Sequence, residues 1–397
     1  MSKGRSSRSP WLILFIVLLT SLAASMSQFK VPPVLPLLMK AFSESPGSAG
    51  LLMSVFAVTG LFMAIPSGLI LQKCGYAATG SAAIFCLILG AGMGALSKGV
   101  GIMLASRFIE GAGMSFMAVL APAIIALWFT EEKRGRAMGI WSVWVPLGST
   151  IMFLIAPLLA GRWGWQGVWW LGFFYTMAAG IFFYLFAASN PRPHPDPGTR
   201  SPTEGYLGQG LRTVLRNRDL WLISLLFGCF NFVFVGFITW APTFLNQGRH
   251  VSLAHAALLV SLTPIISMAA GPIAGWISDR IGSRKGICAI PPFLMALLFP
   301  LSFSAGEGVF LLLAIAIGFL AGFIPTGVFS AGVEVVGNEH LAGMAMAVIQ
   351  IGQNSGMILG PLMIGWVGES FGWQAAFWSM APVSVLGGIS AWTARIR

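Results

Sequence analysis

Three ionisable side chains interrupt long apolar runs of this sequence. Lys30 stands within the segment QFKVPP, and Arg107 and Glu110 stand within RFIEG. A charge at the centre of a membrane-spanning helix costs about 2.5–3.5 kcal/mol on insertion scales. Ionisable residues at such depths are therefore candidates for function.

Arg107 and Glu110 are three residues apart and share a helix face, so they can form an ion pair. Removal from water favours the neutral form of Glu110, whereas the adjacent arginine favours the charged form. An anion arriving at Arg107 would weaken the pair and favour protonation of Glu110. The alternative is a structural pair near the outer interface, because Arg107 lies only about 9 Å along the helix from Gly101.

Lys30 has no acid on its own helix face, and the two prolines that follow it break the helix and free backbone groups. We expect Lys30 and Arg107 to face a cavity in the outer half of the membrane and attract an anion. The alternative for Lys30 is that its long side chain reaches the outer interface. Two buried cations against one acid favour a small anionic substrate.

Several amide side chains also lie in apolar runs. On one helix three of them fall at positions i, i+3 and i+4, which places them on one face beside a GxxxGxxxG row that begins at Gly352 and suits close helix packing. Each amide can bind substrate or hydrogen-bond a neighbouring helix. The candidate substrate ligands are Gln28, Asn231, Gln350, Gln353 and Asn354.

A glycine-rich basic turn, GWISDRIGSRK, runs from residue 275 to 285. It resembles the G-x-x-x-D-R-x-G-R-K loop of the major facilitator superfamily. Glycines permit the tight turn, and the aspartate can cap a helix and pair with the following cations. The resemblance implies a cytoplasmic gate, and the alternative is a basic loop that only sets topology. The gating residues in this half are Gly275, Asp279, Arg280, Gly282 and Arg284.

The first half has an equivalent turn, GLILQKCGYA, which starts at Gly68 and contains Gly75. Gln72 stands where the family has aspartate and the final cations are missing, so we expect a weaker gate there. The segment RFIEGAG is similar to the R-x-x-x-G motif that proton-coupled members carry on their fourth helix. The segment TWAPTFL is similar to organic-anion branches of the family, whereas APLLAG matches the proton-driven drug antiporter motif G-P-x-x-G-G only in part.

The elements that position these residues are apolar helices. Of the 397 residues 56% are hydrophobic and 9% charged, which excludes a water-soluble globular domain. A crossing needs about 20 apolar residues. The first run is too long for a signal peptide and is expected to be retained. The predicted crossings are 11–39, 50–71, 78–97, 101–128, 137–160, 168–188, 220–245, 254–277, 286–304, 309–332, 342–366 and 373–394.

Charge sets the expected orientation. With the N-terminus inside, 17 of the 23 Lys and Arg residues are cytoplasmic and 4 are outside. Positively charged loops stay in the cytoplasm, so both termini are predicted there, in a multi-pass protein of the cytoplasmic (inner) membrane. The net charge of +11 mostly reflects this bias. Short scattered basic loops do not form a nucleic-acid surface.

The chain repeats weakly across a hydrophilic segment rich in Pro, Gly and Arg. Pro36 recurs as Pro242 and Pro66 as Pro272, each at a spacing of 206. We expect an N-terminal bundle of six helices over 1–188, a cytoplasmic linker over 189–219 and a C-terminal bundle over 220–397. The family resemblance implies an all-α membrane protein with pseudo-twofold symmetry and a substrate site between the bundles.

These features favour a secondary transporter over an enzyme. The four histidines are predicted in loops or at helix ends, HExxH, G-x-S-x-G and P-loop motifs are absent, and the four cysteines have no CxxC spacing. We therefore expect no metal site and no cofactor, with a proton gradient as energy source. The expected partners are a small-molecule substrate and the lipid bilayer, with a functional monomer. The runner-up is a proton-driven exporter of lipophilic compounds, and a non-transporting receptor is a further alternative.

Overall fold

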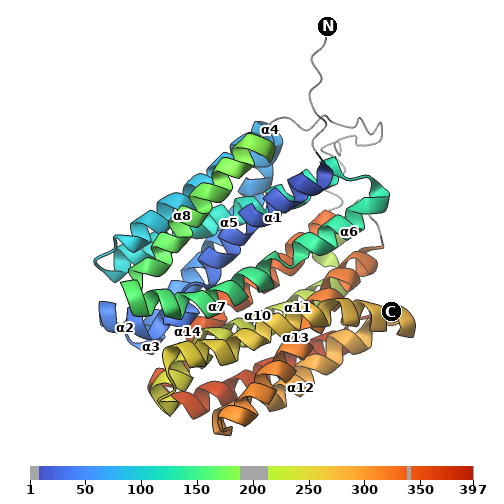
Figure 1. The fold of residues 1–397 in the computed structure, drawn as a ribbon. Helices are drawn as coiled ribbons and strands as arrows, with labels where there is room; N and C mark the ends of the chain where they lie inside the picture. The colour runs from blue at the N-terminus through green and yellow to red at the C-terminus, as the bar shows by residue number, and fades with distance from the viewer. Residues whose placement is uncertain (1–8, 188–212, 338–340, 397) are drawn as a thin grey trace.

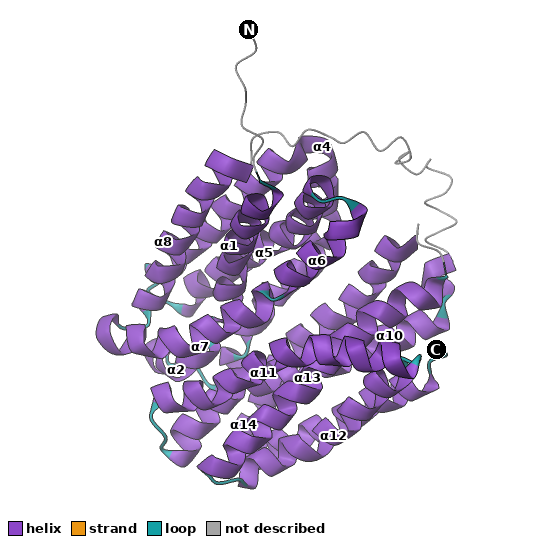
Figure 2. Ribbon diagram, turned by 45° about the vertical axis from the view of Figure 1, so that its right-hand side comes forward, coloured by secondary structure: helices purple, strands orange, loops and turns teal. Residues whose placement is uncertain are grey.

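The computed structural model describes residues 9–187, 213–337 and 341–396, and every regular element in these ranges is a helix (Figures 1 and 2). The helices of the first half are α1 (Pro10–Phe29), η1 (Pro32–Val34), α2 (Leu35–Phe42), α3 (Pro46–Ala49), α4 (Leu51–Ala95), α5 (Val100–Trp128), α6 (Glu131–Ser142), α7 (Trp144–Trp163), α8 (Gln166–Phe182) and η2 (Phe183–Ala187). Those of the second half are α10 (Arg218–Thr243), η3 (Phe244–Gly248), α11 (Leu253–Ile281), α12 (Lys285–Ser304), α13 (Glu307–Val336) and α14 (Ala342–Thr393).

Helices suit a chain in hydrocarbon because they satisfy backbone polar groups within one segment. Eleven helices among the described residues are long and apolar enough to cross a membrane. The 52 residues of α14 would extend about 78 Å at 1.5 Å per residue, which is more than twice the hydrocarbon core. Helix α14 is broken at Gly372 (φ 84°), and α4 is broken at Gly75 (φ 77°). Divided at Gly372, α14 provides the two predicted crossings 342–366 and 373–394.

The two halves lie side by side in Figure 1, with α1 to α8 in blue to green and α10 to α14 in yellow to red. Helices α3 and α4 pack against α14, and α7 packs against α11. Most of the predicted linker, residues 188–212, lies outside the described residues. The predicted domain boundaries therefore stay a prediction.

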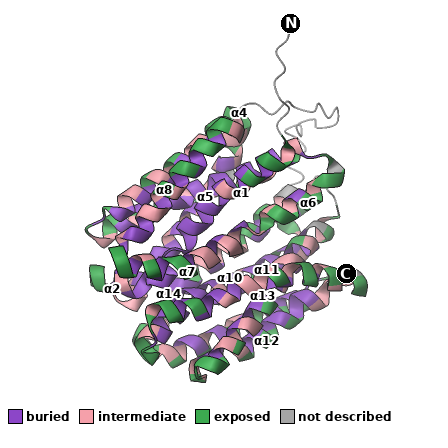
Figure 3. Cartoon of the chain, viewed as in Figure 1, coloured by how far each residue is buried: buried purple, intermediate pink, exposed green. Residues whose placement is uncertain are grey.

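Burial follows the arrangement expected in a bilayer. Buried residues concentrate between the helices, and exposed residues lie on their outward faces (Figure 3). Many of these exposed side chains are large and apolar: Phe62, Phe85 and Leu297 are 69%, 64% and 64% exposed. An apolar outer surface of this kind suits contact with lipid.

The glycine row on α14 packs closely against α10. A Cβ atom added to Gly352, Gly356 or Gly360 would lie 2.0 to 2.3 Å from a backbone carbonyl oxygen of α10. Only residues without a side chain allow this approach. The predicted packing role of the row is confirmed, and its partner is α10.

Candidate functional site

The break in the first helix positions the candidate site. Helix α1 ends at Phe29, and Pro32 and Pro33 begin the 3-10 turn η1. Because proline has no N–H, the carbonyl groups of Gln28 and Phe29 lack the donor that a continuous helix would supply four residues later. The predicted helix break is confirmed, and it leaves backbone acceptors for other groups.

Arg107 on α5 occupies this break. Its Nη2 donates to the carbonyl oxygen of Gln28 at 3.1 Å, its Nη1 donates to that of Ser27, and its Nε donates to that of Leu52 at 3.0 Å. The guanidinium carbon lies 4.6 Å from the centroid of the Phe56 ring. The planar fork of arginine suits several acceptors at once. Arg107 thus ties α5 to the end of α1 and the start of α4.

Glu110 bridges two cations. Its Oε2 accepts from Arg107 Nη1 at 2.6 Å, and its Oε1 accepts from Nζ of Lys30. The side chains of Lys30, Arg107 and Glu110 are 1%, 0% and 0% exposed. Gly90 on α4 provides the space, because a Cβ atom there would lie 2.5 Å from Cγ of Glu110. We call Lys30, Arg107 and Glu110 the charge cluster, and its net charge is +1 with all three ionised.

Lys30 has a second neighbour, which lies on α8. Its Nζ lies 4.6 Å from the centroid of the Trp169 ring on α8. A Cβ atom at Gly172, one turn further along α8, would lie 3.8 Å from the same Nζ. The alternative in which Lys30 reaches the membrane surface is wrong for this structure, because the side chain is enclosed. Its acid is Glu110, which stands 80 positions away in the sequence.

The charge cluster lies inside the first half of the molecule. Its partners come from α1, α4, α5 and α8, and α8 in turn packs against α1, α4, α7 and η2. Direct exposure of Lys30 and Arg107 to a cavity between the halves, as the sequence led us to expect, is not seen in this conformation. The reason is that Glu110 and backbone carbonyls already satisfy most of their donors.

Gln28 lies on a different side of α1, since two residues correspond to about 200° of helix rotation from Lys30. It is buried, and its Oε1 has no hydrogen-bond partner among the described residues. A buried polar atom without a partner is costly and needs an explanation. Asn231 is also buried, but its Nδ2 donates at 2.8 Å to the carbonyl of Phe227 in its own helix.

The three amides of α14 differ in their surroundings. Gln350 is exposed, and its carbonyl accepts from Asn354 Nδ2 at 3.0 Å. Asn354 faces α4, since its Oδ1 would lie 3.1 Å from a Cβ atom at Gly60. Gln353 Oε1 is buried, again with no partner among the described residues. The structure thus brings Asn354 to the contact between the halves.

The halves approach closely along α3, the first turns of α4 and α14. The N–H of Gly47 donates to Glu369 Oε2 at 2.8 Å, and Ser54 Oγ donates to the carbonyl of Ile358 at 2.6 Å. Further along α4, an added Cβ at Gly68 would meet nothing within 4 Å. The two halves are therefore in tight contact near α3, and nothing packs against α4 at Gly68.

The predicted gating turns adopt the expected backbone. Helix α11 ends at Ile281, Gly282 follows with φ 67°, and α12 begins at Lys285. Gly75 has φ 77° at the corresponding point of α4. Such angles favour glycine. A Cβ at Gly275 would meet only Thr326 of the same half, at 3.9 Å.

The charged gating residues make contacts within their own half. Arg284 Nη1 lies 3.4 Å from Glu334 Oε2, and the guanidinium of Arg280 lies 5.3 Å from the ring of Trp276. Gln72 is exposed, and the side chain of Asp279 lies outside the described part of the structure. In this conformation Arg280 and Arg284 are thus engaged by their own half.

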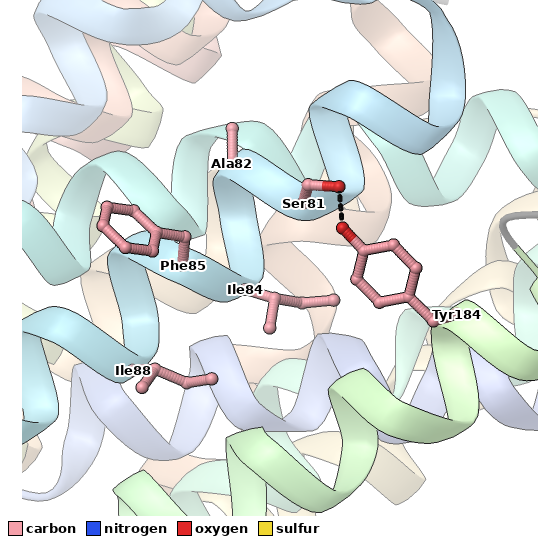
Figure 4. A pocket seen from close by; sticks show the side chains of 6 residues that line it. All are labelled: Ser81, Ala82, Ile84, Phe85, Ile88 and Tyr184. Carbon is pink, nitrogen blue, oxygen red and sulfur yellow. Dashed lines mark hydrogen bonds between the residues drawn. The ribbon is translucent and has the colours of Figure 1, made fainter.

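A separate groove of about 510 Å³ lies between α4 and η2 (Figure 4). The hydroxyls of Ser81 and Tyr184 hydrogen-bond at its rim, and the remaining lining is apolar. Phe85 in this lining is among the exposed apolar side chains, so we assign the groove to the lipid-facing surface. It contains none of the charge cluster. The residues that line it are Ser81, Ala82, Ile84, Phe85, Ile88 and Tyr184.

The net charge of the charge cluster depends on whether Glu110 carries a proton. Protonation of Glu110 would change the net charge of the cluster from +1 to +2, and burial makes that difference costly without another anion. Among the described residues, no group of three or more His, Cys, Asp or Glu could hold a metal ion.

Comparison with known proteins gives a consistent family. A model of the Major Facilitator Superfamily matches residues 14–343. The chain is similar to the hexuronate transporter of Bacillus subtilis (strain 168), with 21% identity over 359 residues, 85% of this chain and 83% of that protein. It is also similar to putative glycerol-3-phosphate transporter 2 of Arabidopsis thaliana, with 24% identity over 319 residues, 69% of this chain and 62% of that protein.

The fold is similar to the crystal structure of a bacterial homolog of the human lysosomal transporter Spinster, in an inward-facing and unoccupied conformation. The TM-score is 0.85 at 16% identity, and the match covers 98% of this chain and 97% of that one. This likeness confirms the predicted all-α fold. Because the family match spans well over half of the sequence, the chain belongs to the Major Facilitator Superfamily and is a membrane transporter, not an enzyme.

Proposed function

We propose that the chain is a secondary active transporter that moves a small organic anion by alternating access, coupled to protons. The support is a buried cluster with two cations and one carboxylate, whose charge depends on a single proton. Relatives named as hexuronate and glycerol-3-phosphate transporters add support, because both named solutes are small organic anions.

The contacts of the Arg107 guanidinium link the protonation state of Glu110 to the end of α1. Arg107 Nη1 donates to Glu110 and to the carbonyl of Ser27 at the same time, while Nη2 of the same guanidinium holds the carbonyl of Gln28. Protonation of Glu110 removes the charge that fixes this guanidinium. The end of α1 is then free to shift, and it carries the unpartnered amide oxygen of Gln28. The proton state is thereby linked to a candidate substrate ligand.

The direction of coupling follows from charge. An anion near the cluster replaces Glu110 as counter-ion, so it favours protonation of Glu110, and by linkage the proton favours the anion. Anion and proton then move together, as in a symporter. Lys30 and Arg107 act on the anion through their electric field, and we propose Gln28, Gln353 and Asn354 as direct ligands. Asn231 and Gln350 are weaker candidates because one is bonded within its helix and the other is exposed.

The conformation supports an inward-facing state under the orientation proposed from loop charge. In that orientation α3 is on the outer side, so the contacts from Gly47 and Ser54 to α14 form a closed outer gate. Gly68 and the gating turns are on the cytoplasmic side, and added Cβ atoms at Gly68 and Gly75 would meet nothing within 4 Å. Asp279, Arg280 and Arg284 would then engage the first half only after the inner side closes.

The first test is a binding screen on the purified protein. Hexuronates, glycerol 3-phosphate, ascorbate, inorganic anions and lipophilic cations are compared by thermal shift. A positive anion is then tested for uptake into proteoliposomes with an imposed pH gradient. Stabilisation by an organic anion and uptake driven by inward proton flow support the proposal. Stabilisation by lipophilic cations alone would instead support the drug exporter, and binding without flux would support a receptor.

Variants separate coupling from binding in the same assay. Glu110→Gln should abolish the dependence of uptake on the pH gradient while exchange of labelled for unlabelled anion continues. Glu307→Gln is the matched control, because Glu307 is an exposed acid at the start of α13. If Glu110→Gln accumulates the anion as the wild type does, the coupling residue lies elsewhere or the driving ion is not a proton.

A further inference from the structure

Pro32 withholds the hydrogen-bond donor of a carbonyl that Arg107 uses. In an α-helix the N–H of each residue donates to the carbonyl four residues earlier, so a donor at position 32 would belong to the carbonyl of Gln28. Proline has no N–H. Pro32 is buried in η1, and Nη2 of Arg107 donates to the Gln28 carbonyl at 3.1 Å. An arginine of another helix thus takes the place of the backbone donor.

The backbone before Pro32 still follows a helical path. Lys30 has φ −72° and ψ −21°, and Val31 has φ −73° and ψ −52°, so both lie in the right-handed helical region. An N–H at position 32 would therefore be directed at the carbonyl of Gln28. What leaves this carbonyl without a backbone donor is the missing N–H of Pro32, and not a turn of the chain.

Pro33 removes the next donor, but a different carbonyl is affected. A donor at position 33 would belong to the carbonyl of Phe29. The hydrogen bonds of Arg107 in the described structure end on Glu110 and on the carbonyls of Ser27, Gln28 and Leu52. Two adjacent buried prolines therefore differ in one respect, since only Pro32 exposes a carbonyl that Arg107 holds.

The equivalent point of the second half has neither the break nor the charges. Shifted by the repeat spacing of 206, position 32 becomes Ile238, which lies inside helix α10 and has an N–H. Position 30 becomes Gly236, and the fourth crossing of that half, α13, has no charged residue between Glu307 and Glu334. The break in the helix thus accompanies the buried arginine.

We propose that Pro32 is a positioning residue for the coupling step: by withholding an N–H, it keeps the Gln28 carbonyl and the end of α1 under the control of Arg107, and so of the proton on Glu110. A donor at position 32 would hold this carbonyl from within α1, whatever the state of Glu110. A carbonyl oxygen accepts two hydrogen bonds, so the new donor need not displace Arg107 to do this. The inference rests on the proposed function, since it assumes that Glu110 exchanges the proton.

The first test measures coupling in proteoliposomes with the anion found by the binding screen. Pro32→Ala supplies the missing donor and should lower the acidification of the lumen per anion taken up about fivefold. This corresponds to about 1 kcal/mol, the net contribution of one backbone hydrogen bond. Exchange of labelled for unlabelled anion should continue. Pro33→Ala is the matched control and should keep the wild-type ratio. If Pro32→Ala does not fold, Pro32→Gly supplies the same donor.

A backbone ester separates the missing donor from the stiffness of the proline ring. Lactic acid incorporated at position 32 has the methyl group of alanine but no N–H, so it should restore the wild-type ratio of protons to anions. An ester variant coupled as poorly as Pro32→Ala would overturn the proposal. Equal ratios in Pro32→Ala and the wild type would also overturn it, and so would an equal loss in Pro33→Ala.

A second readout needs no anion and separates this inference from the proposed function. Lys40 is exposed near the end of α2, which follows η1, so a fluorescent probe on Lys40→Cys, in a background free of other cysteines, reports movement of this segment. Acidification should change its emission, but not when Glu110→Gln or Pro32→Ala is added. A probe that ignores pH in the otherwise wild-type protein refutes both proposals.

The two readouts together assign any failure to one proposal. If the probe responds as expected but wild-type uptake is independent of the pH gradient, the role of Pro32 holds and the proposed coupling is refuted. If wild-type uptake is driven by protons and Pro32→Ala is coupled equally well, the role of Pro32 is refuted and the coupling stands.

Discussion

The charge cluster contains two cations and one anion, and this imbalance predicts how substitutions in it change the stability of the protein. Glu110→Gln removes the single anion and leaves Lys30 and Arg107 buried without a counter-ion. Removing one partner from a buried ion pair costs about 3–5 kcal/mol. Lys30→Met removes the surplus cation, keeps the apolar stem and leaves Arg107 and Glu110 as a balanced pair. Lys30→Met should therefore cost at least about 2 kcal/mol less than Glu110→Gln.

The assay is thermal unfolding of the purified variants in one detergent, and the variants are ranked by their melting temperatures. The expected order of stability is wild type and Lys30→Met, then the double variant Lys30→Met/Glu110→Gln, then Glu110→Gln. The double variant is intermediate because Arg107 alone keeps its three backbone acceptors. Lys40→Met, at an exposed lysine near the end of α2, controls for loss of a positive charge. A Lys30→Met variant as unstable as Glu110→Gln would refute the bridging role of the carboxylate.

Three other predictions concern helix contacts and gates. Gly356→Val should lower the melting temperature and reduce the free energy of unfolding by about 1–3 kcal/mol, because its Cβ would lie 2.1 Å from the Gly228 carbonyl. Gly161→Val is the control, because an added Cβ at Gly161 meets nothing within 4 Å. Gly50→Val should force the outer gate open, since its Cβ would lie 2.6 Å from the Pro361 carbonyl. The opening is measured as faster labelling of a cysteine at position 54 by an impermeant maleimide, in a background free of other cysteines. Asp279→Asn should reduce uptake about tenfold or more, because one turn-stabilising charge is worth about 1–2 kcal/mol. Gln72→Ala should change uptake little. Equal effects of the two substitutions would contradict the expectation that the gate of the first half is the weaker one.

The apolar runs were sufficient to predict the helices. Each predicted crossing has a helical counterpart, because a chain in hydrocarbon has few other ways to satisfy its backbone. The break after Lys30 was also predictable, since Pro32 and Pro33 remove two N–H donors. The three charges were identifiable for the same reason: a charge in an apolar run is costly and therefore conspicuous.

The partners of these charges were not predictable. The contact between Lys30 and Glu110 joins two helices, and no periodicity within one helix can show which helices are neighbours. Without that contact, the sequence predicts a Lys30 that has no acidic partner and faces a cavity. Trp169 was missed because a tryptophan in an apolar run looks like any core aromatic. The available signal was the set of glycines at 90, 94 and 172, which mark where α4 and α8 leave room for large side chains.

The most direct test of the account measures protons and anion together. Proteoliposomes containing a pH-sensitive dye receive, on the outside, the organic anion selected by the thermal-shift screen. Wild-type protein should acidify the lumen as the anion enters, because each anion favours protonation of Glu110. Glu110→Gln should exchange anion without acidification, and Glu307→Gln should behave as the wild type. Acidification by Glu110→Gln at the wild-type rate would contradict the central claim that this carboxylate carries the proton.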